Sequence, residues 1–167
     1  MSTITMSIPA GELQRDLMKI AEKLTEGEVI ILQRTVTLQA MNGFVLKTPT
    51  DTGRARGGWT LEVGTEPPTV ENRKKDRAGG YTLTLAENRL RVLTAYNVIY
   101  IVNDVPYIAV LDQGTYVPSD PGPSKDKRRS RKGKTLVSGG FSVQAPTGMV
   151  DVTLQEIRAG LTIGGAV

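Results

Sequence analysis

The sequence predicts an α+β domain in which a long N-terminal helix packs on a small, mainly antiparallel β-sheet. Apolar residues recur at helical spacing between Leu13 and Leu46, and again from Val150 to Leu161. Between these regions, two short segments have the alternating or β-branched character of strands. A chain of 167 residues is long enough to bury a sizeable core, so we expect residues 1–167 to form a single domain.

The first third of the chain predicts the long helix. Gly27 lies within residues 25–28 and either interrupts this helix or only weakens it, because glycine costs roughly 1 kcal/mol in a helix interior. Pro49 ends the helix. Two apolar stripes favour packing on two partners, the protein's own sheet and a neighbouring subunit; burial of both in one core is the alternative. The stripes comprise Val29, Leu32, Val36, Ala40 and Phe44, and then Ile31, Leu38 and Val45.

The middle of the chain predicts two strands and a short helix. Residues 59–63 alternate as a strand with one buried face, and residues 98–102 are apolar on both faces, as in a central strand. Residues 64–80 form a polar loop. Leu85 to Leu93 has helical spacing, although residues 82–85 could begin as a strand.

The last third predicts a short helix, an exposed loop and a C-terminal helix. Residues 107–113 are amphipathic and are ended by Gly114. Residues 118–140 have the composition of an exposed basic loop insertion. The C-terminal helix has one apolar stripe, formed by Val150, Leu154, Ile157 and Leu161.

Two residue types that many catalytic and metal-binding sites need are absent from the sequence. The chain has no cysteine and no histidine, which excludes thiol nucleophiles, zinc–thiolate sites and triads that need an imidazole. Gly133-Lys134-Thr135 resembles the end of a phosphate-binding loop, but Arg128 occupies the position where that loop needs a glycine. We therefore expect no catalytic residues, no cofactor and no metal.

Three aspartates are the remaining candidates for enzyme chemistry. Asp51, Asp104 and Asp112 each lie beside a predicted turn, and paired carboxylates can hold Mg²⁺ or act as acid and base. Nothing in their spacing brings them together, and Asp51 before Thr-Gly is typical of a turn cap. A carboxylate-based hydrolase is therefore only a lesser alternative.

The chain's only tryptophan ends the stretch Thr48-Pro49-Thr50-Asp51-Thr52-Gly53-Arg54-Ala55-Arg56-Gly57-Gly58-Trp59. Its two arginines suit a subunit interface, a solvated turn or contact with nucleic acid. We predict that they face a neighbouring subunit, so that replacing both with alanine impairs assembly and leaves the monomer folded. The predicted interface residues are Asp51, Arg54, Arg56, Trp59 and Tyr107.

Charge is concentrated in one segment. Residues 125–134 hold seven basic residues and one acid, a net charge of +6, whereas the whole chain carries +4. The rest of the chain therefore carries −2. Such runs bind phosphate backbones without sequence preference, dock on acidic proteins or stay solvated. The residues predicted to contact DNA or an acidic partner are Lys125, Lys127, Arg128, Arg129, Arg131, Lys132 and Lys134.

The sequence also shows no pattern of a signal peptide or a membrane span. The first residues lack the basic and apolar regions of a signal peptide, and no run approaches the roughly 20 apolar residues of a membrane span. We expect a soluble protein that makes no membrane contact.

Three blocks in this order resemble the small neck or tail-completion proteins of tailed bacteriophages, the group that includes minor tail protein Z-like chains. The first block is Thr48-Pro49-Thr50-Asp51-Thr52-Gly53-Arg54 with Gly58-Trp59. The second is Val98-Ile99-Tyr100-Ile101-Val102-Asn103 with Pro106-Tyr107-Ile108-Ala109, and the third is Gln144-Ala145-Pro146-Thr147-Gly148-Met149-Val150. They span roughly residues 47–161. The family's LEYG segment is Leu111-Asp112-Gln113-Gly114 here, without the aromatic residue, and the link before the last block is much longer.

The resemblance implies a non-enzymatic virion protein at the head–tail junction or upper tail, assembled in the host cytoplasm. It implies a ring-shaped homo-oligomer around the DNA channel, with six copies the expected number. Its partners would be other copies of itself, a connector or stopper protein, and a tail terminator or tail tube, with channel DNA as a further contact. A free DNA-binding protein that uses residues 125–134 is the alternative function.

Overall fold

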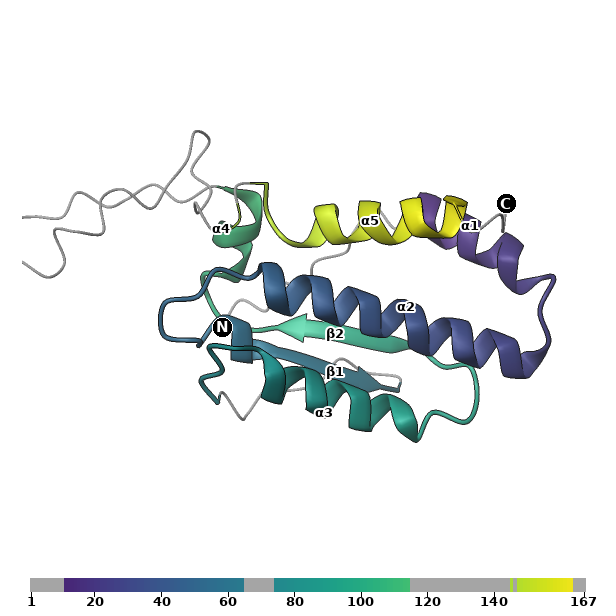
Figure 1. Ribbon diagram of the computed structural model, residues 1–167, viewed down its shortest axis with the longest axis horizontal. Helices are drawn as coiled ribbons and strands as arrows, with labels where there is room; N and C mark the ends of the chain where they lie inside the picture. The colour runs from purple at the N-terminus through teal and green to yellow at the C-terminus, as the bar shows by residue number, and fades with distance from the viewer. Residues whose placement is uncertain (1–10, 65–73, 115–144, 146, 164–167) are drawn as a thin grey trace, which may run out of the picture.

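The computed structural model describes residues 11–64, 74–114, 145 and 147–163. The long helix α2 runs along a two-stranded sheet, with α3 on one side of α2 and α5 on the other (Figure 1). The elements in chain order are α1 (Gly11–Ala21), α2 (Glu26–Lys47), the 3-10 turn η1 (Arg56–Gly58), β1 (Trp59–Val63), α3 (Gly80–Arg91), β2 (Ile99–Asn103), α4 (Ile108–Gln113) and α5 (Val150–Ile163). The expected α+β class is confirmed.

The expected single N-terminal helix is two helices, because the chain interrupts it with a capping box. The Thr25 backbone N–H donates to Glu28 Oε2 at 2.8 Å, and the Glu28 N–H donates to Thr25 Oγ1 at 3.4 Å. These two reciprocal hydrogen bonds satisfy backbone N–H groups at the start of α2 that have no acceptor within the helix. The backbone and side-chain hydrogen bonds from Thr25 also lower the pKa of the Glu28 carboxyl. The helix is therefore interrupted, but at residues 22–25, and Gly27 itself lies in the first turn of α2.

The two strands form an antiparallel pair with Trp59 opposite Asn103 and Val63 opposite Ile99. The strand at residues 59–63 is confirmed, and the second strand is shifted by one residue from the predicted 98–102. β2 was expected to be central, but within the part of the chain that the structure describes β1 is its only neighbour. Residues 82–85 belong to α3, so the strand alternative for them is wrong.

The core lies between α2, the sheet and α5. Met41, Val45 and Met149 are completely buried, and Phe44 packs on Trp59 with ring centroids 5.1 Å apart. Both predicted stripes of α2 reach this core near the C-terminal end of the helix. Near the N-terminal end of α2 the second stripe does not reach the core, since Ile31 is 62% exposed. The predicted stripe of α5 lies on the core side, where Val150 and Ile157 are buried.

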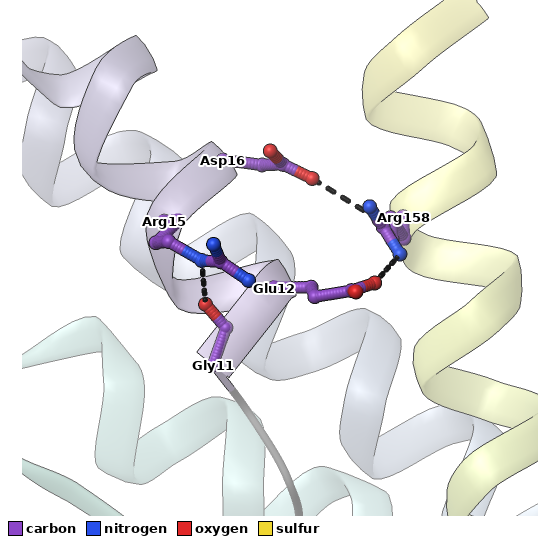
Figure 2. Close-up of polar contacts among 5 residues, drawn as sticks. All are labelled: Gly11, Glu12, Arg15, Asp16 and Arg158. Atoms are coloured by element: carbon purple, nitrogen blue, oxygen red, sulfur yellow. Dashed lines mark hydrogen bonds and ion pairs between the residues drawn. The ribbon is translucent and has the colours of Figure 1, made fainter.

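The helix α1 is tied to α5 by surface ion pairs. Figure 2 shows Arg158 of α5 between two acids of α1, with its Nη1 donating to Glu12 and its Nε donating to Asp16 at 3.1 Å. These hydrogen bonds raise the pKa of the Arg158 guanidinium above its ordinary value. Exposed pairs contribute little each, so they orient α1 more than they stabilise the fold.

By length and composition, α2 would also be suited to crossing a membrane, contrary to the expectation that no segment approaches that criterion. The core helix of a water-soluble fold meets the same criterion. Here α2 contacts α3, α5 and β1, and Met41, Phe44 and Val45 near its C-terminal end are buried in the core.

Candidate functional site at the helix-to-strand joint

Residues 48–59, which we call the joint, connect the end of α2 to the start of β1. Thr48 is completely buried, and both its N–H and its hydroxyl donate to the Phe44 carbonyl, at 3.1 and 2.5 Å. The Trp59 indole N–H in turn donates to the Thr48 hydroxyl at 2.7 Å. One threonine therefore closes α2 and anchors the strand that follows.

Arg56 caps the C-terminus of α2 from within the same chain. Its guanidinium donates to the carbonyls of Leu46 at 3.1 Å, Thr48 at 2.9 Å and Arg77 at 2.7 Å. The last carbonyls of a helix have no partner inside the helix, and a cation there also suits the negative end of the helix dipole. Arg56 thus joins α2, the joint and the segment before α3.

Two glycines allow the joint to pack closely on that segment. Gly53 has a positive φ of 83°, and a Cβ at this position would lie 2.6 Å from the Arg77 nitrogen. A Cβ on Gly57 would lie 2.0 Å from the Lys74 carbonyl oxygen. The Gly53 carbonyl accepts hydrogen bonds from the N–H groups of Gly57 and Asp76. Side chains at these two positions would push the backbones apart.

Asp76 organises the start of α3 beside the joint. One of its carboxylate oxygens accepts from the Gly79 N–H at 2.8 Å, and the other accepts from the Thr82 N–H at 2.9 Å and the Thr82 hydroxyl at 3.0 Å. Burial by itself would raise the pKa of the Asp76 carboxyl. The hydrogen bonds from Thr82 and Gly79 outweigh burial and hold the pKa below its ordinary value.

The outer side of the joint is a shallow depression of about 110 Å³. Three predicted interface residues, Asp51, Arg54 and Tyr107, line it together, and Leu111 of α4 forms part of its wall. Asp51 and Arg54 are exposed, and Tyr107 is 39% exposed. The fold therefore places these three on one surface, although Tyr107 is distant from the others in sequence.

The other two predicted interface residues need correction. Trp59 is only 5% exposed and belongs to the core, because its indole packs on Phe44 and donates to the Thr48 hydroxyl. Arg56 uses its guanidinium to pair backbone carbonyls of its own chain. Replacing both arginines with alanine would therefore disturb the fold as well as any interface, contrary to the expectation of a folded monomer.

Two of the aspartates considered for catalysis have structural positions that need no catalytic role. The Asp112 carboxylate accepts from the N–H groups of Met149 at 2.7 Å and Val150 at 2.9 Å, so it caps the N-terminus of α5. Asp51 lies on the outer side of the joint. Within residues 11–64, 74–114, 145 and 147–163, no group of three or more acids is arranged to hold a metal ion.

The predicted basic contact residues, from Lys125 to Lys134, lie outside the described residues, as does the whole 118–140 insertion. The prediction that they contact DNA or an acidic partner stays a prediction.

Sequence reasoning missed the residues that hold the site together. Asn103 donates through Nδ2 to the Ala55 carbonyl at 2.8 Å and accepts from the Val105 N–H, which joins β2 to the joint. Asp76 and Asp112 cap helices across turns rather than at the usual N-cap position. An aspartate shortly before a helical pattern was the available signal for Asp76, but Gly79 and Gly80 obscured where the helix begins.

In comparisons with known proteins, no protein-family model, no curated protein and no solved structure matches the chain.

Proposed function

We propose that this protein is a structural component of a tailed-phage virion that assembles with copies of itself at the neck or upper tail. It is a tail-completion or head–tail joining protein without enzymatic activity. It forms a ring around the DNA channel, with six copies the expected number, and contacts a connector or stopper protein on one side and a tail terminator or tail tube on the other.

The joint carries this proposal. Its inner residues, Thr48, Arg56 and Trp59, fix the backbone through hydrogen bonds to their own chain. Its outer residues, Asp51 and Arg54, therefore project from a rigid loop beside Tyr107. A rigid surface with an arginine and a tyrosine is typical of protein interfaces, because little side-chain and loop entropy is lost on binding. The joint also contains one of the three blocks that resemble the neck proteins.

The test has two parts. Size-exclusion chromatography with light scattering should give a mass several times the 18.0 kDa of one chain, and electron microscopy of the purified protein should show rings. Cryo-electron microscopy of particles of the phage that carries this chain should place it at the neck or upper tail. A stable monomer, or particles that lack the chain, would overturn the proposal.

A second candidate function rests on the concentrated charge of residues 125–134, which favours non-specific DNA binding. Fluorescence anisotropy with duplex DNA would show binding that weakens steeply with salt, with a log–log slope of about −0.9 per phosphate neutralised. A monomer that loses this binding when residues 125–134 are deleted would favour the second candidate over the first. A ring that binds DNA through them would assign the segment to the channel.

A further inference from the structure

The segment before α3, Lys74-Lys75-Asp76-Arg77, has mixed charge in the sequence but separated charge in the structure. Asp76 is 8% exposed, and its carboxylate faces inward, where it accepts hydrogen bonds from the start of α3. Lys74, Lys75 and Arg77 are all exposed. The fold therefore turns the one acid of this segment inward and leaves three cations outside, which we call the basic surface.

Contacts with the joint fix the backbone beneath the basic surface. The Asp76 N–H donates to the Gly53 carbonyl at 3.0 Å, and Arg56 Nη1 donates to the Arg77 carbonyl at 2.7 Å. Both contacts use the backbone of residues 76 and 77, so they leave the side chains of Lys75 and Arg77 available for a partner. A surface whose backbone is already ordered loses little loop entropy on binding.

Acids of the same chain do not neutralise the basic surface. Within the part of the chain that the structure describes, none of its three cations forms an ion pair, whereas Lys47, Arg89 and Arg158 each do. Lys74 holds its Nζ 3.8 Å from the centroid of the Tyr81 ring, and this cation–π contact leaves the positive charge in place. The three charges therefore remain available to an anionic partner.

The composition of the basic surface favours nucleic acid over a protein as that partner. Lysine is depleted in protein–protein interfaces, whose cores are apolar and aromatic. Two of the three cations here are lysines, and Lys74 lies over the aromatic ring nearest to them, that of Tyr81. Protein–DNA interfaces are more polar and much more positively charged, and most of their hydrogen bonds go to phosphate and sugar.

We propose that Lys74, Lys75 and Arg77 bind the phosphate backbone of duplex DNA without sequence preference. The inference deepens the proposed function and rests on it for the source of the DNA, which is the duplex in the channel. The basic surface is separate from residues 125–134, the basis of the second candidate function. In this arrangement the start of α3 faces the channel, while the outer side of the joint faces the neighbouring subunit.

The salt dependence of DNA binding tests the proposal. Lys75→Ala combined with Arg77→Ala removes two charges and leaves the carbonyl of residue 77 for Arg56. In fluorescence anisotropy with a duplex of arbitrary sequence, this double variant should bind more weakly. Its log–log salt slope should be smaller in magnitude by about 1.8, because each lost phosphate contact contributes about 0.9.

Lys19→Ala combined with Lys23→Ala is the matched control, because it removes the same charge from two exposed positions in and just after α1. The control should keep the slope of the natural protein, and circular dichroism should be unchanged in both double variants. No DNA binding by the natural protein, an unchanged slope in Lys75→Ala/Arg77→Ala, or an equal change in the control would each overturn the proposal.

A competitor distinguishes phosphate from carboxylate partners. Unlabelled duplex should displace the labelled duplex from the natural protein at a lower charge concentration than polyglutamate does. Equal displacement would indicate an acidic protein as the partner and would overturn the assignment to DNA. A monomer whose slope falls in Lys75→Ala/Arg77→Ala would overturn the proposed ring and support the basic surface. Rings whose slope is unchanged in that variant would overturn the basic surface alone.

Discussion

The inner and outer sides of the joint differ in how they use polar groups. On the inner side, Arg56 and the Thr48 hydroxyl are held by hydrogen bonds to their own chain. On the outer side, Arg54 and Tyr107 expose their side chains beside a shallow depression. The first arrangement stabilises one chain, while the second leaves side chains that gain free energy only when another surface covers them. Substitutions in the two regions should therefore separate folding from assembly.

The largest loss of stability should follow from Trp59→Ala. It removes a buried indole from its contact with Phe44 and leaves the Thr48 hydroxyl without its donor, so the free energy of unfolding should fall by about 3–5 kcal/mol. Urea unfolding followed by circular dichroism measures this loss. Trp59→Phe, which keeps a ring on Phe44, is the matched control and should lose clearly less. Equal losses would show that ring packing is unimportant at the joint.

The two arginines of the joint should give opposite phenotypes. Arg56→Ala leaves helix-end carbonyls without a donor and should lower the free energy of unfolding by about 1–3 kcal/mol. Arg54→Ala, on the exposed side, should change it by less than about 0.5 kcal/mol and should weaken assembly instead. Chemical denaturation and light scattering on both variants measure the two effects. Normal assembly by Arg54→Ala would remove this residue from the proposed interface.

Asp76→Asn should cost about 1–2 kcal/mol near neutral pH, because the amide cannot accept all three hydrogen bonds. The folded-state pKa of Asp76 lies below its unfolded value of about 3.9, so its contribution is present above that pH and is lost as the pH falls through the folded-state pKa. The difference between the natural protein and Asp76→Asn should therefore shrink below about pH 4. Thermal unfolding measured from neutral to acid pH tests this; a constant difference would contradict it.

The smallest effect should come from the capping box of α2. Thr25→Ala removes the acceptor for the Glu28 N–H and should cost about 1 kcal/mol. For a domain of this size that corresponds to a decrease in Tm of about 2–4 °C. Thr25→Ser keeps the hydroxyl and serves as the control in the same melting experiment. A Tm for Thr25→Ala equal to that of the serine variant would show that the cap contributes nothing.

Local patterns were sufficient where neighbours in sequence decide the structure. The alternation of residues 59–63 gave the strand β1, and Gly114 ended α4 with a φ of 67°. Pro49 marked the end of α2 within two residues. These features follow from dihedral preferences and side-chain periodicity, which a single segment of chain contains.

The joint shows what local patterns could not supply. Sequence reasoning placed Arg56 and Trp59 at an interface because arginine and aromatic residues are common there, but the fold places Trp59 in the core and turns Arg56 onto carbonyls of α2. The fold also brings Tyr107 beside Asp51 and Arg54 in one depression, although nothing local in the sequence connects them.

The sequence by itself determined the α+β class, the approximate positions of most helices and strands, and the exclusion of cysteine and histidine chemistry. Only the tertiary structure decided which polar residues point inward. The Asp112 side chain has one inner partner, the N-terminus of α5, that is specified by how segments distant in sequence pack. A buried polar group must find a hydrogen-bond partner, and the identity of that partner depends on the whole fold.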